Sequence, residues 1–263
     1  MRASILFLIP LLGAVSCLSI TAKLKDGYDS VYVYYQNVTT HVDGKLQSEV
    51  LTHLHLFLRP GTEKETVVGR LQNLLVIPEN VTAEDLSLIK EIESPFKIVF
   101  TADGKQSQIF TKKDEHKHAL KTKDSVLKLL LQNVTQIDEY LLRSEKSLHD
   151  EDCQSFVHVE KKENEYVFET ETKLHDCNNQ TTLQGYVSDQ SEFRLFYHLD
   201  AEDKKLIKAK SIIDLTYLTS VRARINTVQD MEFVRFDGLK EDIDENVLTE
   251  AHTSEQIDEL WKQ

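Results

Sequence analysis

The chain has 263 residues, of which 40% are hydrophobic, and a formal net charge of −13. This length is enough for one large β domain or two small ones. The negative charge argues against nucleic acid and anionic membrane surfaces as partners, because both repel an acidic protein. A mean hydropathy of −0.37 is typical of a soluble globular protein.

The first 17 residues predict a secretory signal peptide. Arg2 supplies a short positive region, and residues 5–12 form an apolar core that is too short to span a bilayer. The alternative for this stretch is a membrane anchor. No later stretch is long and apolar enough to be a transmembrane segment. We therefore expect a secreted, extracellular protein that passes through the endoplasmic reticulum.

The cysteines and glycosylation sequons agree with secretion. Cleavage after Cys17 would leave an even pair, Cys153 and Cys177, whereas cleavage after Ser16 would leave an odd number. In an oxidising compartment we expect this pair to form a disulfide, which would contribute about 3 kcal/mol in the loop-entropy model. Four Asn-x-Thr sequons predict glycosylated surface positions: Asn37, Asn80, Asn133 and Asn179.

The first part of the mature chain is predicted to be β-strand. Residues 28–38, 45–58 and 66–77 predict strands, with turn signals at Asp43-Gly44 and Pro60-Gly61 between them. In the second strand the alternation places two sets of side chains on opposite faces: Leu54, Leu56 and Leu58 on one, and His53, His55 and Phe57 on the other.

Residues 81–93 predict either a short helix or a loop. Residues 96–100 and 106–110 then predict a hairpin that turns at Asp103-Gly104. A charged segment over residues 112–118 leads into the strongest helical signal of the chain.

That helix is predicted over residues 120–133, which contain neither Gly nor Pro, with Asp124 or Ser125 as its N-cap. Its apolar residues cover most of the circumference, which is typical of a helix buried on most sides: Val126, Leu127, Leu129, Leu130 and Leu131. Because nearly everything around it is predicted to be strand, we expect β-structure wrapped about it. The alternative is an amphipathic helix packed on one face of a sheet.

The rest of the chain continues as short strands. The expected strands are residues 153–160, 165–173, 193–199, 206–210, 211–225 and 230–236. No Pro/Gly/Ser-rich linker divides residues 24–239, so we expect one domain. Residues 240–263 form an acidic tail, which is either loosely attached or the start of a truncated helical region.

The sequence contains no nucleophile elbow, no His-Glu-x-x-His, no P-loop and no dinucleotide fingerprint. Two histidine pairs at i, i+2, His53 with His55 and His116 with His118, could chelate a metal. The simpler interpretation is that they face solvent. We therefore expect no enzyme activity, no catalytic or metal-binding residues and no cofactor.

Four stretches, in order, resemble the N-terminal domain of the large lipid transfer proteins. This family includes vitellogenins, apolipophorins, apolipoprotein B and the large subunit of microsomal triglyceride transfer protein. The stretches are a Tyr-rich first strand at Tyr32–Tyr35, a Phe-x-x-Asp-Gly element at Phe100–Gly104, a helix ending in Leu-Leu-Gln at Leu120–Gln132, and a cysteine pair at Cys153 and Cys177.

The resemblance implies a mainly β fold over residues 24–239, an antiparallel β-barrel wrapped around a central buried α-helix. It implies lipid transport or lipid binding, with lipid, a lipid-transfer partner chain or a lipoprotein-type receptor as partner. The helix departs from the family by starting with Leu120-Lys121 where the family has Asn. In the family a helical arch and two further sheets build most of the lipid cavity, and the resemblance does not extend to these parts. The alternative is therefore a stand-alone secreted interaction module without that cavity.

Overall fold

The computed structural model describes residues 24–63, 65–77, 83–100, 107–131, 145–149, 154–173, 191–202, 205–218, 222–239 and 242–259. Its strands are β1 (Tyr28–Val42), β2 (Lys45–Pro60), β3 (Thr66–Ile77), β4 (Phe96–Phe100), β5 (Ser107–Thr111), β6 (Glu145–His149), β7 (Gln154–Lys161), β8 (Glu165–Lys173), β9 (Glu192–Asp200), β10 (Leu206–Leu218), β11 (Arg222–Gly238) and β12 (Glu250–His252). Its helices are α1 (Ala83–Ile92), α2 (Lys117–Leu131), α4 (Ser254–Glu259) and the short 3₁₀ helix η4 (Glu245–Val247).

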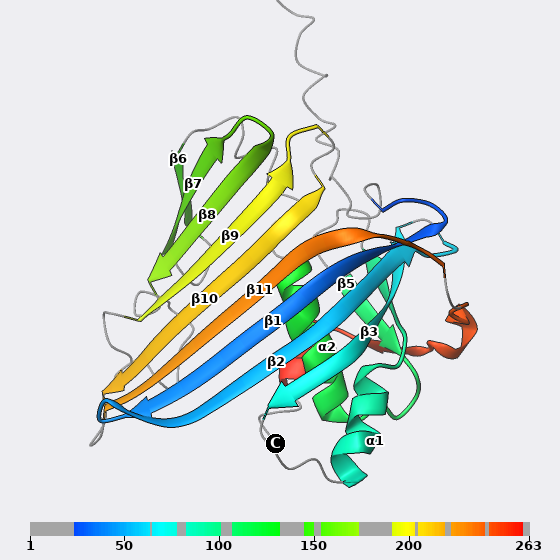
Figure 1. Ribbon diagram of the computed structural model, residues 1–263, viewed down its shortest axis with the longest axis horizontal. Helices are drawn as coiled ribbons and strands as arrows, with labels where there is room; N and C mark the ends of the chain where they lie inside the picture. The colour runs from blue at the N-terminus through cyan, green and yellow to red at the C-terminus, as the bar shows by residue number, and fades with distance from the viewer. Residues whose placement is uncertain are drawn as a thin grey trace, which may run out of the picture.

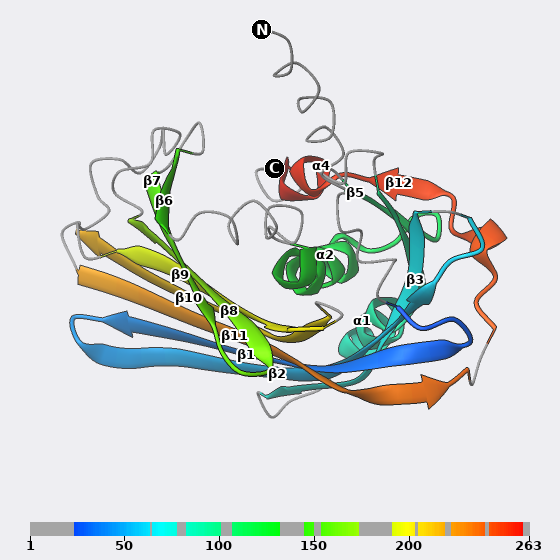
Figure 2. The ribbon, with the colours of Figure 1, turned by 90° about the horizontal axis from the view of Figure 1, so that it is seen from above.

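Within these ranges the twelve strands form one antiparallel sheet in the order β12-β5-β4-β3-β2-β1-β11-β10-β9-β8-β7-β6. The fold is therefore mainly β, as predicted. The sheet is strongly curved, and α2 lies against its concave face (Figures 1 and 2). The expected closed barrel is not found, because β12 and β6 are the two edges of the sheet and do not pair with each other.

The longest hairpin of the sheet joins β1 and β2 through the predicted turn at Asp43-Gly44. Both residues have positive φ, 49° for Asp43 and 78° for Gly44. This is the backbone that a two-residue turn needs to follow the right-handed twist of its strands, and Asp-Gly adopts it at low cost. The Asp43 side chain also accepts a hydrogen bond from the backbone of Arg222, which ties the turn to β11.

The predicted two faces of β2 are confirmed. Leu54, Leu56 and Leu58 are fully buried on the concave side. His53 and His55 point to the opposite face, where their rings meet edge to face with centroids 5.6 Å apart. The alternation in the sequence therefore identifies which side of this strand carries the core.

Helix α2 begins at Lys117, three residues before the predicted start. The prediction that Asp124 or Ser125 caps it is wrong, because Asp124 lies in the middle of the helix. There its carboxylate is 3.0 Å from the ammonium of Lys128, one turn further on. An (i, i+4) ion pair of this kind compensates a residue that otherwise disfavours a helix interior.

Helix α2 is buried by elements on several sides. It contacts α1, α4, β10 and β11. The side chains that carry this packing are at most 3% exposed: Ala119, Leu120, Val126, Leu127, Leu129 and Leu130. The hydroxyl of Tyr197 on β9 donates to the backbone oxygen of Leu129 at 2.9 Å, which joins the helix directly to the sheet.

The region before α2 combines a helix with a hairpin. Residues predicted as helix or loop form α1, whose Ile92 is buried against the core. The strands β4 and β5 pair as predicted, with Ile98 opposite Ile109. The predicted turn between them lies outside the described residues.

Residues 242–259 are not the loosely attached tail that was one of the two expectations. Strand β12 pairs with β5, and Ile257 of α4 is fully buried next to α2. Two carboxylates attach this segment to the rest of the molecule. Glu245 accepts a hydrogen bond from the backbone N–H of Thr62, and Glu250 accepts one from the backbone N–H of Asp114. The acidic composition of the segment gave no indication of these specific contacts.

Replacing Leu127 or Leu130 with Ala is expected to lower the free energy of unfolding by about 2–5 kcal/mol, because each substitution leaves a cavity in the core. Urea unfolding followed by circular dichroism measures this. Leu86→Ala on α1, where the side chain is 54% exposed, is the matched control and should change stability by about 0.5 kcal/mol or less. Equal, small effects at all three positions would contradict the burial of α2.

Candidate functional site

A cleft lies between α2 and the concave face of the sheet. It consists of two adjoining pockets of about 360 Å³ and about 240 Å³. Gln36 of β1 and Ser125 of α2 line both pockets and form the neck between them. The volumes are at or below the lower end of the roughly 300–1,000 Å³ that small-molecule sites occupy, so the cleft has the size of a single small ligand.

One stripe of α2 supplies the helical wall of this cleft. The residues of the larger pocket follow helical spacing: His118, Lys121, Thr122, Ser125 and Val126. Lys128 and Leu129 continue the stripe into the smaller pocket. Residues three and four apart lie on the same face of a helix. The apolar residues of α2 therefore pack into the core, while this mostly polar stripe faces the cleft.

The floor of the cleft is a polar network on the concave face of the sheet. The amide nitrogen of Gln229 on β11 donates to the Tyr34 hydroxyl at 2.9 Å and to the Ser125 hydroxyl at 3.0 Å. The Ser211 hydroxyl donates to the oxygen of the same amide at 2.8 Å. Gln229 therefore links β1, β10, β11 and α2 at one point.

Tyr34 is buried under α2, and this burial disfavours the deprotonated, charged form of its phenol. Burial raises the pKa of Tyr34 from 10.0 to about 12, while the hydrogen bonds to Gln229 and Ser125 oppose the shift. The phenol consequently stays a neutral hydrogen-bonding group throughout the physiological range.

Three charged side chains of α2 lie along the cleft. The buried Asp124 carboxylate is 3.0 Å from Lys128 and 4.0 Å from Lys121. Two ammonium groups therefore lie near one carboxylate, and Lys128 is the nearer of the two. The Lys121 and Lys128 side chains are each about one third exposed, so solvent screens them only in part.

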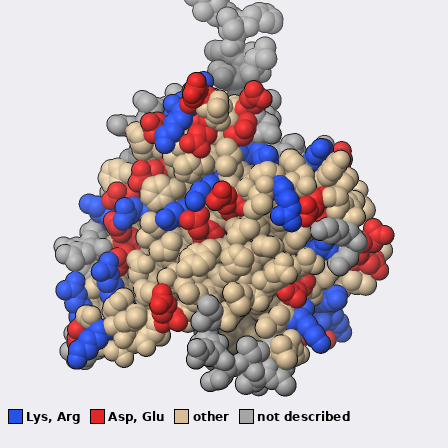
Figure 3. All heavy atoms as spheres, in the orientation of Figure 1, with Lys and Arg blue, Asp and Glu red and all other residues tan. Residues whose placement is uncertain are grey.

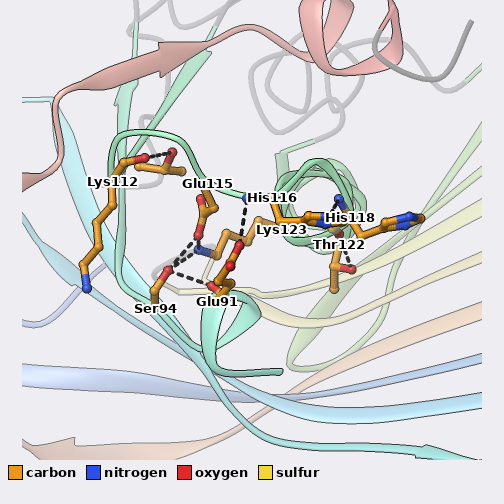
Figure 4. Close-up of polar contacts among 9 residues, drawn as sticks. Glu91, Ser94, Lys112, Glu115, His116, His118, Thr122 and Lys123 are labelled. Atoms are coloured by element: carbon orange, nitrogen blue, oxygen red, sulfur yellow. Dashed lines mark hydrogen bonds and ion pairs between the residues drawn. The ribbon is translucent and has the colours of Figure 1, made fainter. Parts of the chain in front are cut away.

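A buried ion pair positions the N-terminal end of α2, which is the end that lies at the larger pocket (Figure 4). The ammonium of Lys123, whose side chain is fully buried, contacts the carboxylate of Glu115 and donates to the Ser94 hydroxyl at 2.9 Å. Ser94 follows α1, and its hydroxyl also lies 2.7 Å from the backbone oxygen of Glu91. The pair therefore joins α2, the segment before it and the end of α1.

The surroundings of Lys123 disfavour its charge. Burial lowers the pKa of Lys123, and the Glu115 carboxylate opposes that shift. The second carboxylate oxygen of Glu115 is buried and accepts no hydrogen bond within the described part of the chain. Loss of one partner would leave the other as a buried unpaired charge. The pair is therefore costly to break, although it contributes less to the net stability than its geometry suggests.

Sequence reasoning missed Lys123, because a lysine between Thr122 and Asp124 looks like a surface residue. The spacing contains the signal that could have found it. Position 123 is four residues after Ala119 and four before Leu127, so it falls in the centre of the apolar face of α2.

Of the residues predicted as covalent sites, the structure describes Asn37 alone. It lies in the middle of β1, half-buried, and its side-chain amide donates to Glu49 at 3.1 Å. The other sequons, Asn80, Asn133 and Asn179, and the pair Cys153 and Cys177 lie outside the described residues, as does the predicted signal peptide.

Neither histidine pair gains a third potential metal ligand in the part of the chain that the structure describes. No group of three or more potential ligands gathers anywhere in these residues. The rings of His116 and His118 stack on each other with centroids 5.2 Å apart. None of the described helices has the length and apolar character needed to cross a membrane.

The convex face carries charges of both signs around a broad uncharged area (Figure 3). Tyr35, His53 and Leu75 occupy one row across β1, β2 and β3, since each pairs with the next in register. Tyr35 is 38% exposed and Leu75 is 57% exposed. This face therefore presents apolar groups outward, on the side away from the cleft.

Lys123→Met is expected to lower the free energy of unfolding by about 3–5 kcal/mol, because it leaves the Glu115 carboxylate buried without its cation. The double variant Lys123→Met/Glu115→Leu should recover most of this loss, since it removes both charges. Urea unfolding of the four proteins of this cycle gives the coupling.

The exposed pair Lys162 and Glu160, 3.8 Å apart, provides the control for this cycle. The same substitutions there should cost about 1 kcal/mol or less. A double variant at 115 and 123 that is as unstable as Lys123→Met would show that shape, and not charge, is what these residues supply.

The raised pKa of Tyr34 predicts a loss of stability in alkali. Between pH 10 and 12 the unfolded tyrosine has lost its proton while the folded one keeps it, so the free energy of unfolding falls as pH rises. Tyr34→Phe should therefore lose stability less steeply over this range than the parent protein. Urea unfolding at stepped pH values measures both slopes, with Tyr35→Phe on the convex face as the control. Identical slopes for all three proteins would contradict the prediction.

No protein-family model matches the chain, and no curated protein matches it. Among solved structures, it is similar to lipovitellin, in a structure that describes lipid–protein interactions, with a TM-score of 0.64 and 12% sequence identity. The match covers 84% of this chain and 26% of the lipovitellin chain, so the protein spans about a quarter of that molecule.

Two further similarities are too weak to support an argument. A LolA superfamily protein from Nitrosomonas europaea matches with a TM-score of 0.24 at 10% identity, covering 89% of this chain and 96% of that one. An outer membrane channel from Pseudomonas putida F1 matches with a TM-score of 0.26 at 8% identity, covering 80% and 97%. Of these three similarities, the one with lipovitellin shows a shared fold.

Proposed function

We propose that the protein is a secreted, vitellogenin-like glycoprotein of the lipid transfer class that binds and transports lipid. The observation that carries this proposal is the fold it shares with lipovitellin over 84% of its length. The sequence resemblance to the N-terminal domain of the same family supports it independently. Secretion and glycosylation rest on the predicted signal peptide and sequons.

The lipid would occupy the cleft between α2 and the sheet. Helix α2 lies against the concave face of the open sheet, and the leucines that pack it are buried. The room left beside it is the two pockets of about 360 Å³ and about 240 Å³. The load proposed for this part of the molecule is therefore one small lipid and not a multi-chain droplet.

A second function is favoured by the convex face. Exposed apolar side chains such as Tyr35 and Leu75 suit contact with another protein, because such a contact would remove their apolar surface from water. The protein would then be an interaction module for a lipid-transfer partner chain or a lipoprotein-type receptor.

Lipid analysis separates the two functions. Protein purified from culture medium without detergent is expected to yield lipid in stoichiometric amount when its organic extract is measured by mass spectrometry. Ser125→Phe, which narrows the neck shared by both pockets, should reduce the recovered lipid severalfold. Leu86→Phe on the exposed face of α1 is the matched control and should leave it unchanged. Recovery of no lipid from the parent protein would refute carriage and leave the interaction module.

A further inference from the structure

One row of side chains on the concave face runs from polar to apolar across four strands. In register, it consists of Gln229 of β11, Gln36 of β1, Thr52 of β2 and Val76 of β3. Gln36, Thr52 and Val76 line the larger pocket, and Val76 is 39% exposed although it lies on the concave side. Neighbouring strands lie about 4.8 Å apart, so the pocket changes from polar to apolar over about 10 Å.

The apolar end of the larger pocket is built by three elements. Leu74 joins Val76 from β3, Ile92 comes from α1, and Val126 comes from α2. The backbone N–H of Leu74 donates to the carboxylate of Glu93 at 3.3 Å, which ties the wall from β3 to the end of α1. These walls offer an apolar chain contact on more than one side, and such contact removes its surface from water.

The polar end of the pocket is the neck of the cleft, where the hydroxyls of Tyr34 and Ser125 meet. Both residues line the larger pocket, and Tyr34 is 1% exposed. The Gln229 amide donates its two hydrogens to these two hydroxyls, so each hydroxyl still has its own hydrogen to donate. A bond between the two hydroxyls uses one of these hydrogens, and no hydrogen bond within the described residues uses the other. One donor is therefore available at the neck to an oxygen of a ligand.

We infer that the larger pocket binds a neutral lipid with one acyl chain, whose carbonyl oxygen accepts a hydrogen bond from the Tyr34–Ser125 hydroxyl pair. The chain follows the row from Gln36 to Val76 and ends among the apolar walls, in a volume of about 360 Å³ that suits one chain of medium length. The inference rests on the lipid-binding function proposed above and gives it a ligand class, a single-chain acyl ester. A carbonyl oxygen accepts hydrogen bonds and does not donate them, which matches a neck whose available group is a donor.

The charges around the pocket favour a neutral head over an anionic one. Lys121 and His118 line the pocket nearer the start of α2, and the Lys121 ammonium lies 4.0 Å from the carboxylate of Asp124. The carboxylates of Glu91 and Glu115 also lie at this end of the helix, where they contact the backbone of residue 116 and the ammonium of residue 123. An anionic head would meet charges of both signs here, in a protein whose net charge is −13, and would lose its hydration. An ester gains its hydrogen bond at the uncharged neck without that loss.

Four probes test the ligand class by equilibrium dialysis against the purified protein, followed by gas chromatography of both compartments. They are methyl nonanoate, which has chain and ester; nonane, which has the chain alone; nonanoate, whose head is anionic; and methyl acetate, which has the ester alone. Methyl nonanoate is expected to bind at least about tenfold more tightly than nonanoate, because the anion must give up more hydration. Methyl acetate should not bind measurably. Nonanoate that binds as tightly as methyl nonanoate would overturn the neutral head, and methyl acetate that binds as tightly would overturn the placement of the chain.

Removal of the hydroxyl pair tests where the head lies. The double variant Tyr34→Phe/Ser125→Ala nearly keeps the shape of the neck and removes both hydroxyls from the pocket. It should weaken methyl nonanoate binding by about threefold to tenfold, the scale of one neutral hydrogen bond, and leave the nonane affinity unchanged. Each single variant keeps one hydroxyl and should show a smaller loss. Tyr35→Phe removes the same atom on the convex face and is the matched control, which should bind both probes as the parent does.

Two results with the double variant would overturn the assignment. Unchanged affinity for methyl nonanoate would show that the hydroxyl pair does not bind the ester. An equal loss of affinity for nonane and methyl nonanoate would show that the two hydroxyls only shape the neck.

The results also separate this inference from the proposed function. Fatty-acid anions in the extract of the secreted protein, together with tighter binding of nonanoate than of methyl nonanoate, would refute the neutral ligand and leave lipid carriage standing. Methyl nonanoate binding that the double variant weakens selectively, with no lipid in the extract, would establish the site and refute carriage of lipid during secretion.

Discussion

The structure depends on holding one helix against the concave face of an open sheet. An open sheet does not enclose a core by itself, so another element must cover its concave face. Leucines of α2 supply the apolar contact, and the Lys123–Glu115 ion pair joins the helix to the segment before it and, through Ser94, to the end of α1. Because that pair is buried, separating its two charges costs far more than the loss of a surface ion pair.

This arrangement explains why a cleft exists at all. Helix α2 would seal the concave face if its apolar surface ran all the way round, but one stripe is mostly polar and lines the two pockets on that side. On the sheet side of the cleft lie three polar side chains that form hydrogen bonds with one another: Tyr34, Ser211 and Gln229. The space is therefore maintained by hydrogen bonding on its floor and by packing on the other sides of the helix.

Much of the fold could be predicted from the sequence. Local signals were sufficient for most of the strands, for the Asp43-Gly44 turn and for the two faces of β2, since each depends on residues close together in the chain. They did not predict β6 or β12, and they divided β10 into two strands. The closure of the sheet could not be read in this way, because it depends on how strongly the whole sheet curves and on which strands become its edges. The family resemblance suggested a closed barrel, and the strand order shows an open sheet.

The candidate site was harder to predict than the fold. Lys123 and Glu115 are eight residues apart and look like two members of a charged, solvated segment, and only the apolar neighbours at helical spacing mark Lys123 as buried. Gln229 is nearly two hundred residues from its partner Tyr34. No local pattern predicts such a contact, because the pairing of β1 with β11 creates it.

That pairing has a consequence for how the protein is made. Strand β1 pairs with β11 from Tyr28–Gly238 at one end to Val42–Ala223 at the other. During synthesis the edge of β1 in the β1–β2 hairpin therefore stays unpaired while the chain from Pro60 to Arg222 is made. An edge of this length is a template for wrong partners, and contacts so distant in sequence form slowly. Productive folding of this chain should accordingly depend on protecting its N-terminal hairpin until β11 is available.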